Sequence, residues 1–247
     1  MNESFQPIPV KAPGDNRMGF AVRCFVDLQL LSVYRFLRRE LPPCRGRVLD
    51  VGAGQAPWRE LLHGAEYVGL DVESASDFGM RNAPGMVYYD GISIPFPDAS
   101  FDHILCSEVL EHVPDAKAFM AEVSRVVRTG GSIVLTVPWS ARLHHLPHDY
   151  RRLTRQGLLA LFSESGFIGV RIEERGNDVA VVANKLIVML IRLLRPSTPV
   201  HVPWCWPMAL LLAPVAAGFV IAAHVSVALG LGSREDPLGY GVVAIKG

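Results

Sequence analysis

The sequence has no excess of charge of either sign. Its 247 residues include 24 Lys and Arg and 24 Asp and Glu, so the formal net charge is zero. Proteins that bind nucleic acid through their overall charge are strongly basic. The composition therefore gives no support to a nucleic-acid partner, and we expect none.

Cysteine is scarce in the chain. The four cysteines form no CxxC pair, and their spacing fits no zinc site. We therefore expect reduced thiols in a cytoplasmic protein and no metal site. Residues 1–16 are polar and rich in Pro and Gly, and they lack the apolar core of a signal peptide. This also favours a cytoplasmic location.

Charged residues are missing from a long stretch near the C-terminus. Val202 to Leu231 contains no Asp, Glu, Lys or Arg, and it exceeds the roughly 20 residues that cross a bilayer. Trp204 and Trp206 stand at its start, as interfacial tryptophans do in membrane proteins. With the apolar segment 179–194, this stretch predicts a hydrophobic, membrane-associated helical insertion. The alternative is a buried helix or a dimer contact in a soluble protein.

Before that insertion, short apolar runs alternate with helical patterns. This order predicts a parallel sheet with helices on both faces. We expect strands at 47–51, 67–72, 86–89, 101–106, 132–137, 169–174 and 240–245. We expect helices at 18–41, at 57–62, from 114 to the glycine pair at 130–131, and at 155–165.

The chain divides into four predicted segments. Residues 1–45 form an arm, flexible over 1–17, and a helix that packs on the core or covers a cofactor. The α/β core spans 46–177, the insertion spans 178–236, and the final core strand lies within 237–247. Because the last two strands must pair in one sheet, a single membrane crossing is excluded. The insertion crosses twice, dips in and returns near Pro214, or lies flat.

A glycine loop after the first strand is the centre of the predicted site. In Asp50-Val51-Gly52-Ala53-Gly54 the glycines let the backbone turn sharply and approach a ligand closely. Asp71, at the end of the second strand, can accept hydrogen bonds from both hydroxyls of a ribose. The pattern predicts a nucleotide-type cofactor. A dinucleotide fingerprint needs a glycine where Pro57 stands, which counts against a dehydrogenase.

Together with Asp90-Gly91 and the stretch Phe101-Asp102 to Glu111-His112, this loop resembles class I S-adenosylmethionine-dependent methyltransferases, most closely their type 11 group. The resemblance covers residues 45–175 and the last strand. It implies a Rossmann-like, seven-stranded, mostly parallel sheet, with the insertion between strands six and seven. It also implies S-adenosyl-L-methionine as cofactor, with Asp71 at the ribose and Asp90 at the adenine. The implied cofactor-binding residues are Asp50, Gly52, Ala53, Gly54, Asp71, Val72, Asp90, Gly91, Ser107, Glu108 and His112.

Methyl transfer to an oxygen also needs a base. We favour His148 and Asp149, in the loop after the fifth strand, with His145 and Glu108 as further catalytic candidates and His112 as another. Alternatively, His148, Asp149 and Arg151 pin this loop to the domain.

The insertion favours a lipid or lipid-linked acceptor, such as a polyprenyl-linked sugar or an isoprenoid quinone. We expect the protein at the cytoplasmic face of the cell membrane. A function of another class stays open, that of a non-catalytic cofactor-binding scaffold that uses the insertion for membrane or partner assembly.

Overall fold

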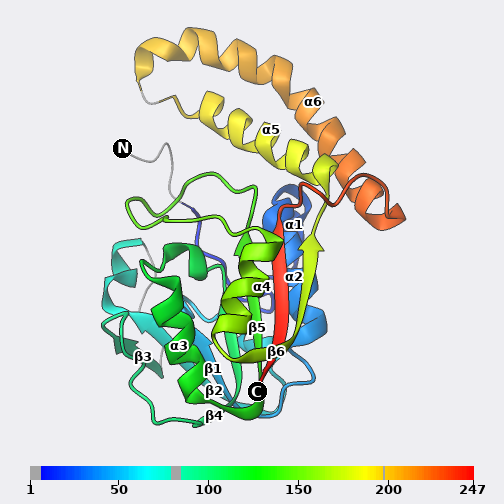
Figure 1. Cartoon of the computed structure of the whole chain (residues 1–247). Coiled ribbons are helices and arrows are strands. Elements are labelled where there is room, and N and C mark those ends of the chain that lie inside the picture. The colour runs from blue at the N-terminus through cyan, green and yellow to red at the C-terminus, as the bar shows by residue number, and fades with distance from the viewer. Residues whose placement is uncertain (1–6, 79–84, 197) are drawn as a thin grey trace.

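A seven-stranded sheet forms the centre of the computed structural model, which describes residues 7–78, 85–196 and 198–247 (Figure 1). The strand order is β3-β2-β1-β4-β5-β7-β6, and β7 alone runs antiparallel to its neighbours. The predicted fold class is therefore confirmed. The strands are β1 (Gly46–Val51), β2 (Ala65–Val72), β3 (Met86–Tyr89), β4 (Phe101–Ser107), β5 (Val127–Pro138), β6 (Phe167–Arg175) and β7 (Gly239–Lys246).

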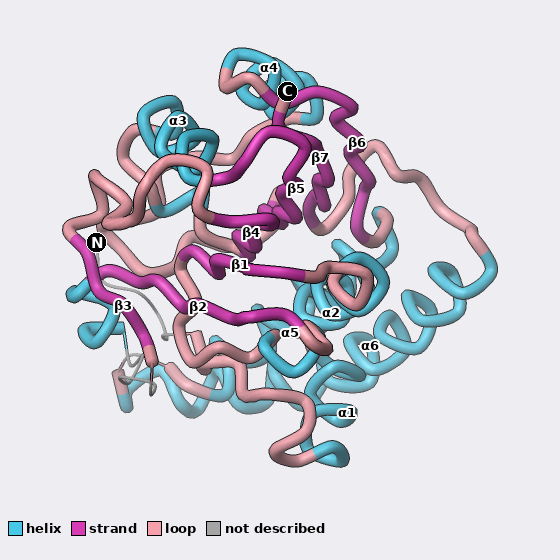
Figure 2. Tube along the Cα trace, turned by 90° about the horizontal axis from the view of Figure 1, so that it is seen from below, coloured by secondary structure: helices cyan, strands magenta, loops and turns pink. Residues whose placement is uncertain are grey.

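Helices cover both faces of this sheet. Figure 2 shows α3 and α4 on one face and α2 on the other. Each face has its own buried apolar cluster, so the sheet is dry on both sides. The helices are α1 (Arg17–Val26), α2 (Leu28–Glu40), α3 (Ala116–Val126), α4 (Arg155–Glu164), α5 (Asp178–Leu194) and α6 (Val202–Leu229), with short 3-10 helices η1 (Arg59–Leu61), η2 (Glu73–Phe78), η3 (Leu110–His112) and η4 (Pro199–His201).

The predicted helix 18–41 is two helices. Asp27 breaks it, because its backbone leaves the helical region and its side chain accepts a hydrogen bond from Leu30 N at 3.0 Å. A carboxylate in that position caps the start of α2. Residues 1–6 of the predicted arm lie outside the described residues. The rest of the arm is anchored, since Arg23 donates to the carbonyls of Ile8 and Pro9.

Two predicted helix boundaries are wrong. The helix expected at 57–62 is only the three-residue η1, too short for a dipole or a set of free amides to act on a ligand. The helix α3 ends at Val126, four residues before the glycine pair at 130–131. Val127 already pairs with Phe101, and the glycines lie in the irregular part of β5 where its register shifts. The pairing of Val127 with β4 therefore ends the helix before the glycines do.

The insertion is a hairpin of α5 and α6 between β6 and β7. Both helices lie beyond the carboxyl ends of the parallel strands, with α5 next to the core and α6 outside it (Figure 1). Asn177 fastens the base of the hairpin: its side chain accepts from Ala180 N and donates to Ser226 Oγ and Leu231 O. The 28-residue α6 contains an 18-residue stretch with a mean hydropathy of 2.2, so by length and composition alone it is apolar enough to cross a membrane.

Candidate functional site

The glycine loop leaves β1 at the strand edge that the sequence predicts. Asp50 is 2% exposed and accepts a hydrogen bond from Tyr67 Oη at 2.7 Å. Burial raises the pKa of Asp50 to about 7, against the lowering effect of the Tyr67 hydroxyl. Gly52 has a φ of 73°, and a Cβ there would lie 2.3 Å from Val109 Cγ2. Glycine is therefore required at this turn.

The loop continues through Ala53 and Gly54 to Ala56. Ala53 is buried and its N–H donates to Leu70 O. Gly54 has a φ of 55° and Ala56 a φ of 53°. Ala56 thus adopts the left-handed conformation that glycine usually supplies, which costs energy for a residue with a Cβ. The loop geometry survives the alanine because Ala56 N also bonds to Ala53 O at 2.7 Å.

Asp71 closes this cradle from β2. One carboxylate oxygen accepts from Gly54 N and the other from Val72 N, both at 2.8 Å. Burial nevertheless raises the pKa of Asp71. Each carboxylate oxygen has a second acceptor site. The carboxylate is thus fixed in place and still able to receive the two hydroxyls of a ribose.

The ends of β3 and β4 complete this row of sites. Asp90 accepts from Ser93 N and Ile92 N, and these bonds lower the pKa of its carboxyl. A Cβ on Gly91 would lie 3.3 Å from Val72 Cγ1, so the ends of β2 and β3 meet closely. Ser107, at the end of β4, bonds to Thr136 Oγ1 at 3.0 Å. Because β3, β2, β1 and β4 are consecutive in the sheet, all predicted cofactor residues except His112 lie at or just beyond one row of strand ends.

Glu108 follows Ser107 with a φ of 57° and does not point freely into the site. Its carboxylate accepts from Arg175 Nη2 at 2.7 Å and from Gln29 Nε2 at 3.1 Å. Arg175 is buried and also donates to the carbonyls of Val137 and Tyr240. Glu108 therefore joins the strand ends to α2, which places the start of α2 beside the site.

The catalytic candidates after β5 fall into two groups. Asp149 accepts two bonds from Arg152, at 2.5 and 2.9 Å, and one from His144 N at 3.0 Å. Burial acts to raise the pKa of Asp149, but these bonds bring it below its ordinary value. His148 is exposed and its Nδ1 lies 3.0 Å from Tyr150 Oη. Asp149 thus holds the loop, while His148 faces solvent.

Three other imidazoles converge beside this loop. His112 comes from η3, and His144 and His145 come from the loop after β5; the ligand nitrogens of the three lie within 4.8 Å of one another. Burial lowers the pKa of both His112 and His145 to about 4. The two rings are therefore neutral near pH 7. His145 also adopts a left-handed φ of 54°.

Glu111, just before His112, has a buried carboxyl. No sequence pattern singled it out as a functional residue. It is 2% exposed, and neither carboxylate oxygen has a hydrogen-bond partner among the described residues. Burial, reinforced by Glu108, raises its pKa well above the ordinary value. Glu111 and His144 are 33 positions apart in sequence, so only the fold brings them together. In the sequence, the adjacent pair His144-His145 was the one pattern that could have indicated this cluster.

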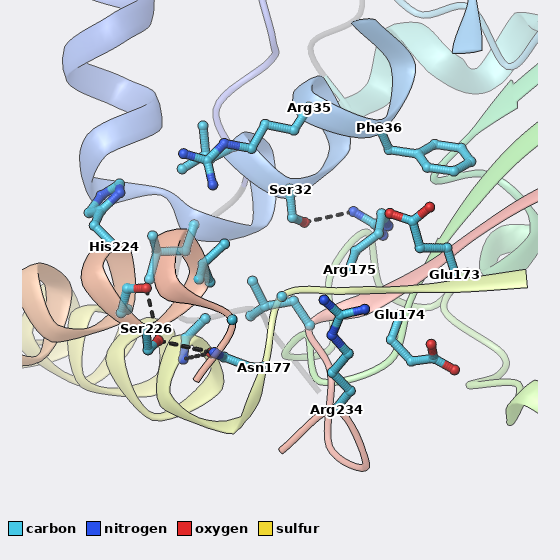
Figure 3. Close-up of a pocket in the computed structure, with 18 of the residues that line it drawn as sticks. Ser32, Arg35, Phe36, Glu173, Glu174, Arg175, Asn177, His224, Ser226 and Arg234 are labelled. Atoms are coloured by element: carbon cyan, nitrogen blue, oxygen red, sulfur yellow. Dashed lines mark hydrogen bonds between the residues drawn. The ribbon is translucent and has the colours of Figure 1, made fainter. Parts of the chain in front are cut away.

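A separate pocket of about 200 Å³ lies where the hairpin joins the core. Figure 3 shows Arg35 of α2, Arg175 of β6 and Arg234 around it, with Asn177 and Ser226 bonded at its edge. Arg175 belongs both to this pocket and to the Glu108 contact. The pocket and the strand-end site are therefore connected through one buried guanidinium.

Part of the chain resembles known proteins in sequence. Residues 49–135 match a family model described as a methyltransferase domain. The chain is 34% identical over 99 residues to the demethylmenaquinone methyltransferase of Staphylococcus saprophyticus, a match of 36% of this chain and 42% of that protein. It is 37% identical over 102 residues to phthiotriol/phenolphthiotriol dimycocerosates methyltransferase 1 of Mycobacterium ulcerans, a match of 36% of each protein. The chain thus spans less than half the length of these curated relatives.

The fold as a whole is also known. A Thermotoga maritima protein described as a SAM-dependent methyltransferase, possible histamine N-methyltransferase, superposes with a TM-score of 0.56. The match covers 95% of this chain and 98% of that chain at 12% sequence identity. At this identity the likeness shows the shared fold. It extends across the elements that the sequence matches do not reach.

Proposed function

Because residues 49–135 match a methyltransferase-domain family model and the fold is that of S-adenosylmethionine-dependent methyltransferases, we propose that this protein is such an enzyme. The observation that carries the proposal is Asp71. Its carboxylate is buried, oriented by two backbone N–H groups and set at a strand end beside a glycine loop. This chemistry fits the ribose of the cofactor.

The residues of the chain have distinct tasks in this proposal. Asp71 accepts the ribose hydroxyls, the loop 50–54 lies against the methionine part, and Asp90 accepts the adenine amino group. The bound sulfonium supplies an activated methyl group. The chain has to hold the acceptor in line with it, and such positioning contributes roughly 7–11 kcal/mol in favourable cases. His148, exposed at the loop after β5, is the proposed base, and Asp149 holds that loop.

The surface of α6 supports a membrane location. A helix that is apolar on all sides is normally buried in protein or in lipid. The buried residues of α6 are mostly small, whereas most of its large side chains are exposed. Burial inside this chain therefore does not explain the composition of the helix. The exposed large residues of α6 are Trp204, Trp206, Met208, Leu210, Leu211, Val215, Phe219, Ile221, Val225 and Leu229.

The contacts of α5 favour a hairpin that lies flat on the membrane. Lys185 of α5 donates to Ser140 O in the loop after β5, so the middle of α5 is held on the core. A helix held there cannot also cross a bilayer. The outer side of α6 continues into α1, where Phe25 stacks on His224 with ring centroids 4.7 Å apart. Met18, Val22 and Val26 of α1 extend this apolar surface.

A lipid or lipid-linked acceptor follows from this arrangement. The hairpin lies beyond the strand ends, so an acceptor in the membrane would reach the methyl donor without entering water (Figure 1). The relatives named for demethylmenaquinone and for phthiotriol and phenolphthiotriol dimycocerosates agree with such an acceptor. We propose methylation of an oxygen of a glycan or isoprenoid compound, at the cytoplasmic face of the cell membrane.

Cofactor binding tests the central claim. Calorimetric titration of the purified protein with S-adenosylmethionine should show one site. Asp71→Ala should weaken binding by about 2–3 kcal/mol, or roughly 30–150-fold, because it removes charge-assisted hydrogen bonds. Asp98→Ala is the matched control: Asp98 is an exposed aspartate paired with Arg125, and it precedes β4, at the end of that strand opposite to the site. Equal affinities of the parent and Asp71→Ala would refute the assignment.

Mass spectrometry of lipid extracts tests the acceptor. Extracts of cells without the protein, incubated with the protein and methyl-labelled cofactor, should gain a labelled lipid. Transfer only to water-soluble compounds would overturn the lipid acceptor. Cofactor binding with no labelled product from any extract would favour the non-catalytic scaffold.

A further inference from the structure

The ring contacts of His112 and His144 define which nitrogens carry protons. His112 Nδ1 lies 2.6 Å from His148 O, and His144 Nδ1 lies 3.1 Å from Arg142 O. A carbonyl oxygen only accepts, so in each ring Nδ1 must carry the proton. In a neutral imidazole the other nitrogen then has a lone pair. In the neutral form of each ring, Nε2 is therefore the acceptor.

These two nitrogens face each other. His112 Nε2 and His144 Nε2 are 3.2 Å apart, close enough to share one proton or one ion. Two nitrogens bound to one tetrahedral Zn²⁺ at about 2.0–2.1 Å are themselves about 3.3 Å apart. The observed spacing is thus that of two ligands of a single ion.

A third nitrogen and a carboxylate complete the set. His145 brings its ring to within 5.3 Å of both other rings, measured between centroids. Glu111 Oε1 lies 3.7 Å from His112 Nε2 and 3.9 Å from His144 Nε2. Glu111 is 2% exposed, and neither of its oxygens has a hydrogen-bond partner among the described residues. A cation between the rings would compensate this buried carboxylate.

The Nδ1 atoms of His112 and His144, which face away from the proposed ion, make contacts that fix the orientation of both rings. His112 is oriented by the His148 carbonyl, and His144 Nδ1 also lies 3.3 Å from Asp149 Oδ2. Metal-binding histidines normally make such a bond through the nitrogen that faces away from the ion. Asp149 is itself fixed by Arg152.

We propose that His112, His144 and His145, with Glu111 beside them, form a binding site for a divalent transition-metal ion of the Zn²⁺ type. Imidazole nitrogens with one carboxylate suit such ions. The ion joins η3 to the loop after β5 and fixes that loop at the edge of the site. The site goes beyond the proposed methyl transfer and does not depend on it. It differs from the expectation, drawn from cysteine spacing, that the chain has no metal site.

Metal titration of the full chain tests this site. After dialysis against chelator, the parent should bind one Zn²⁺ per chain by elemental analysis. With Co²⁺ it should show the visible ligand-field absorption of a tetrahedral site. His112→Gln and His144→Gln should each weaken binding by more than the roughly 10–100-fold that loss of an outer contact costs, and Asp149→Asn should fall within that range. His63→Gln, at an exposed histidine, should bind as the parent does.

Hydrogen exchange of the parent tests the site even if the variants fold poorly. Zn²⁺ added to the parent should slow amide exchange in residues 142–150 and leave that of β6 unchanged. The proposal is overturned if the parent retains far less than one ion per chain. It is equally overturned if His112→Gln and His144→Gln, shown to be folded by circular dichroism, bind Zn²⁺ as tightly as the parent. Neither result bears on cofactor binding, which requires no metal in its own test.

Discussion

Three carboxyl groups are buried near the strand ends, and each has a different environment. Asp50 accepts from a tyrosine hydroxyl, Asp71 accepts from two backbone N–H groups, and Glu111 has no hydrogen-bond partner among the described residues. Burying a carboxylate is costly unless it is paired. This energetic cost of burial falls on residues at or next to the predicted site, where function is expected to oppose stability.

The Asp50 carboxyl predicts a pH dependence of stability. Its pKa is about 7 in the folded protein and 3.8 ordinarily, because burial disfavours the charged form. Between these values the folded state holds a proton that the unfolded chain releases, so the free energy of unfolding falls as pH rises. From about pH 5 to pH 8 this group should contribute a loss of about 3 kcal/mol.

Urea unfolding of the parent and of Asp50→Asn, without cofactor, measures this contribution. The asparagine cannot titrate and can still accept from Tyr67, so the difference between the two proteins isolates the carboxyl. The difference should change in favour of the variant as pH rises. Parallel curves would show that Asp50 titrates normally.

At the scale of elements, the hairpin depends on a seam of small residues. Ala209, Ala216 and Ala223 are buried at seven-residue intervals along α6 and let it approach α5 closely. At the base of the seam, Asn177 and Ser226 form a buried polar pair. Asn177 also caps α5.

We expect Asn177→Ala to loosen the hairpin selectively. The change removes a helix cap and leaves Ser226 and Leu231 O without their partner, at a cost of about 2–4 kcal/mol. Hydrogen exchange should accelerate in α5 and α6 while β1 and β4 keep their protection. Asn16→Ala, which removes the exposed cap of α1, is the control and should affect α1 alone. Uniform acceleration across the sheet would mean that the hairpin has no independent stability.

The sequence predicted elements best where a single signal dominated. β3 occupies the expected residues because Met86 to Tyr89 is a short apolar run between turns. The break at Asp27 was missed because apolar residues continue with helical spacing across it. The glycine loop and Asp71 could be predicted from local sequence pattern, because Gly52 directly follows β1 and Asp71 lies at the end of β2. The His112, His144 and Glu111 cluster could not, because its members meet only after β4 and β5 pair.

At the scale of the whole molecule, exposed apolar residues are concentrated on α6 and α1. A patch of this extent on a soluble protein usually marks a contact surface. The division of the chain at residues 178 and 236 stays a prediction.

We expect the protein to float with lipid vesicles in a density gradient, and to do so in high salt, because apolar burial is not screened. Leu210→Ser with Leu211→Ser should release it, since two leucines contribute at least about 3 kcal/mol, or over roughly 100-fold in partitioning. Leu159→Ser with Ile168→Ser, at exposed apolar positions on α4 and β6, should float like the parent. Vesicle-independent dimers of the parent, abolished by the α6 change, would identify α6 as a subunit contact instead.

The position of β7 has a consequence for how the chain is made. β7 follows α6 in sequence but pairs with β5 on one side and β6 on the other. During synthesis, β5 and β6 emerge with a gap between them, and the apolar hairpin leaves the ribosome before the strand that fills it. If the hairpin binds lipid as proposed, it can do so while the sheet is still open, before β7 fills the gap. Insertion of β7 would then complete the domain at the bilayer.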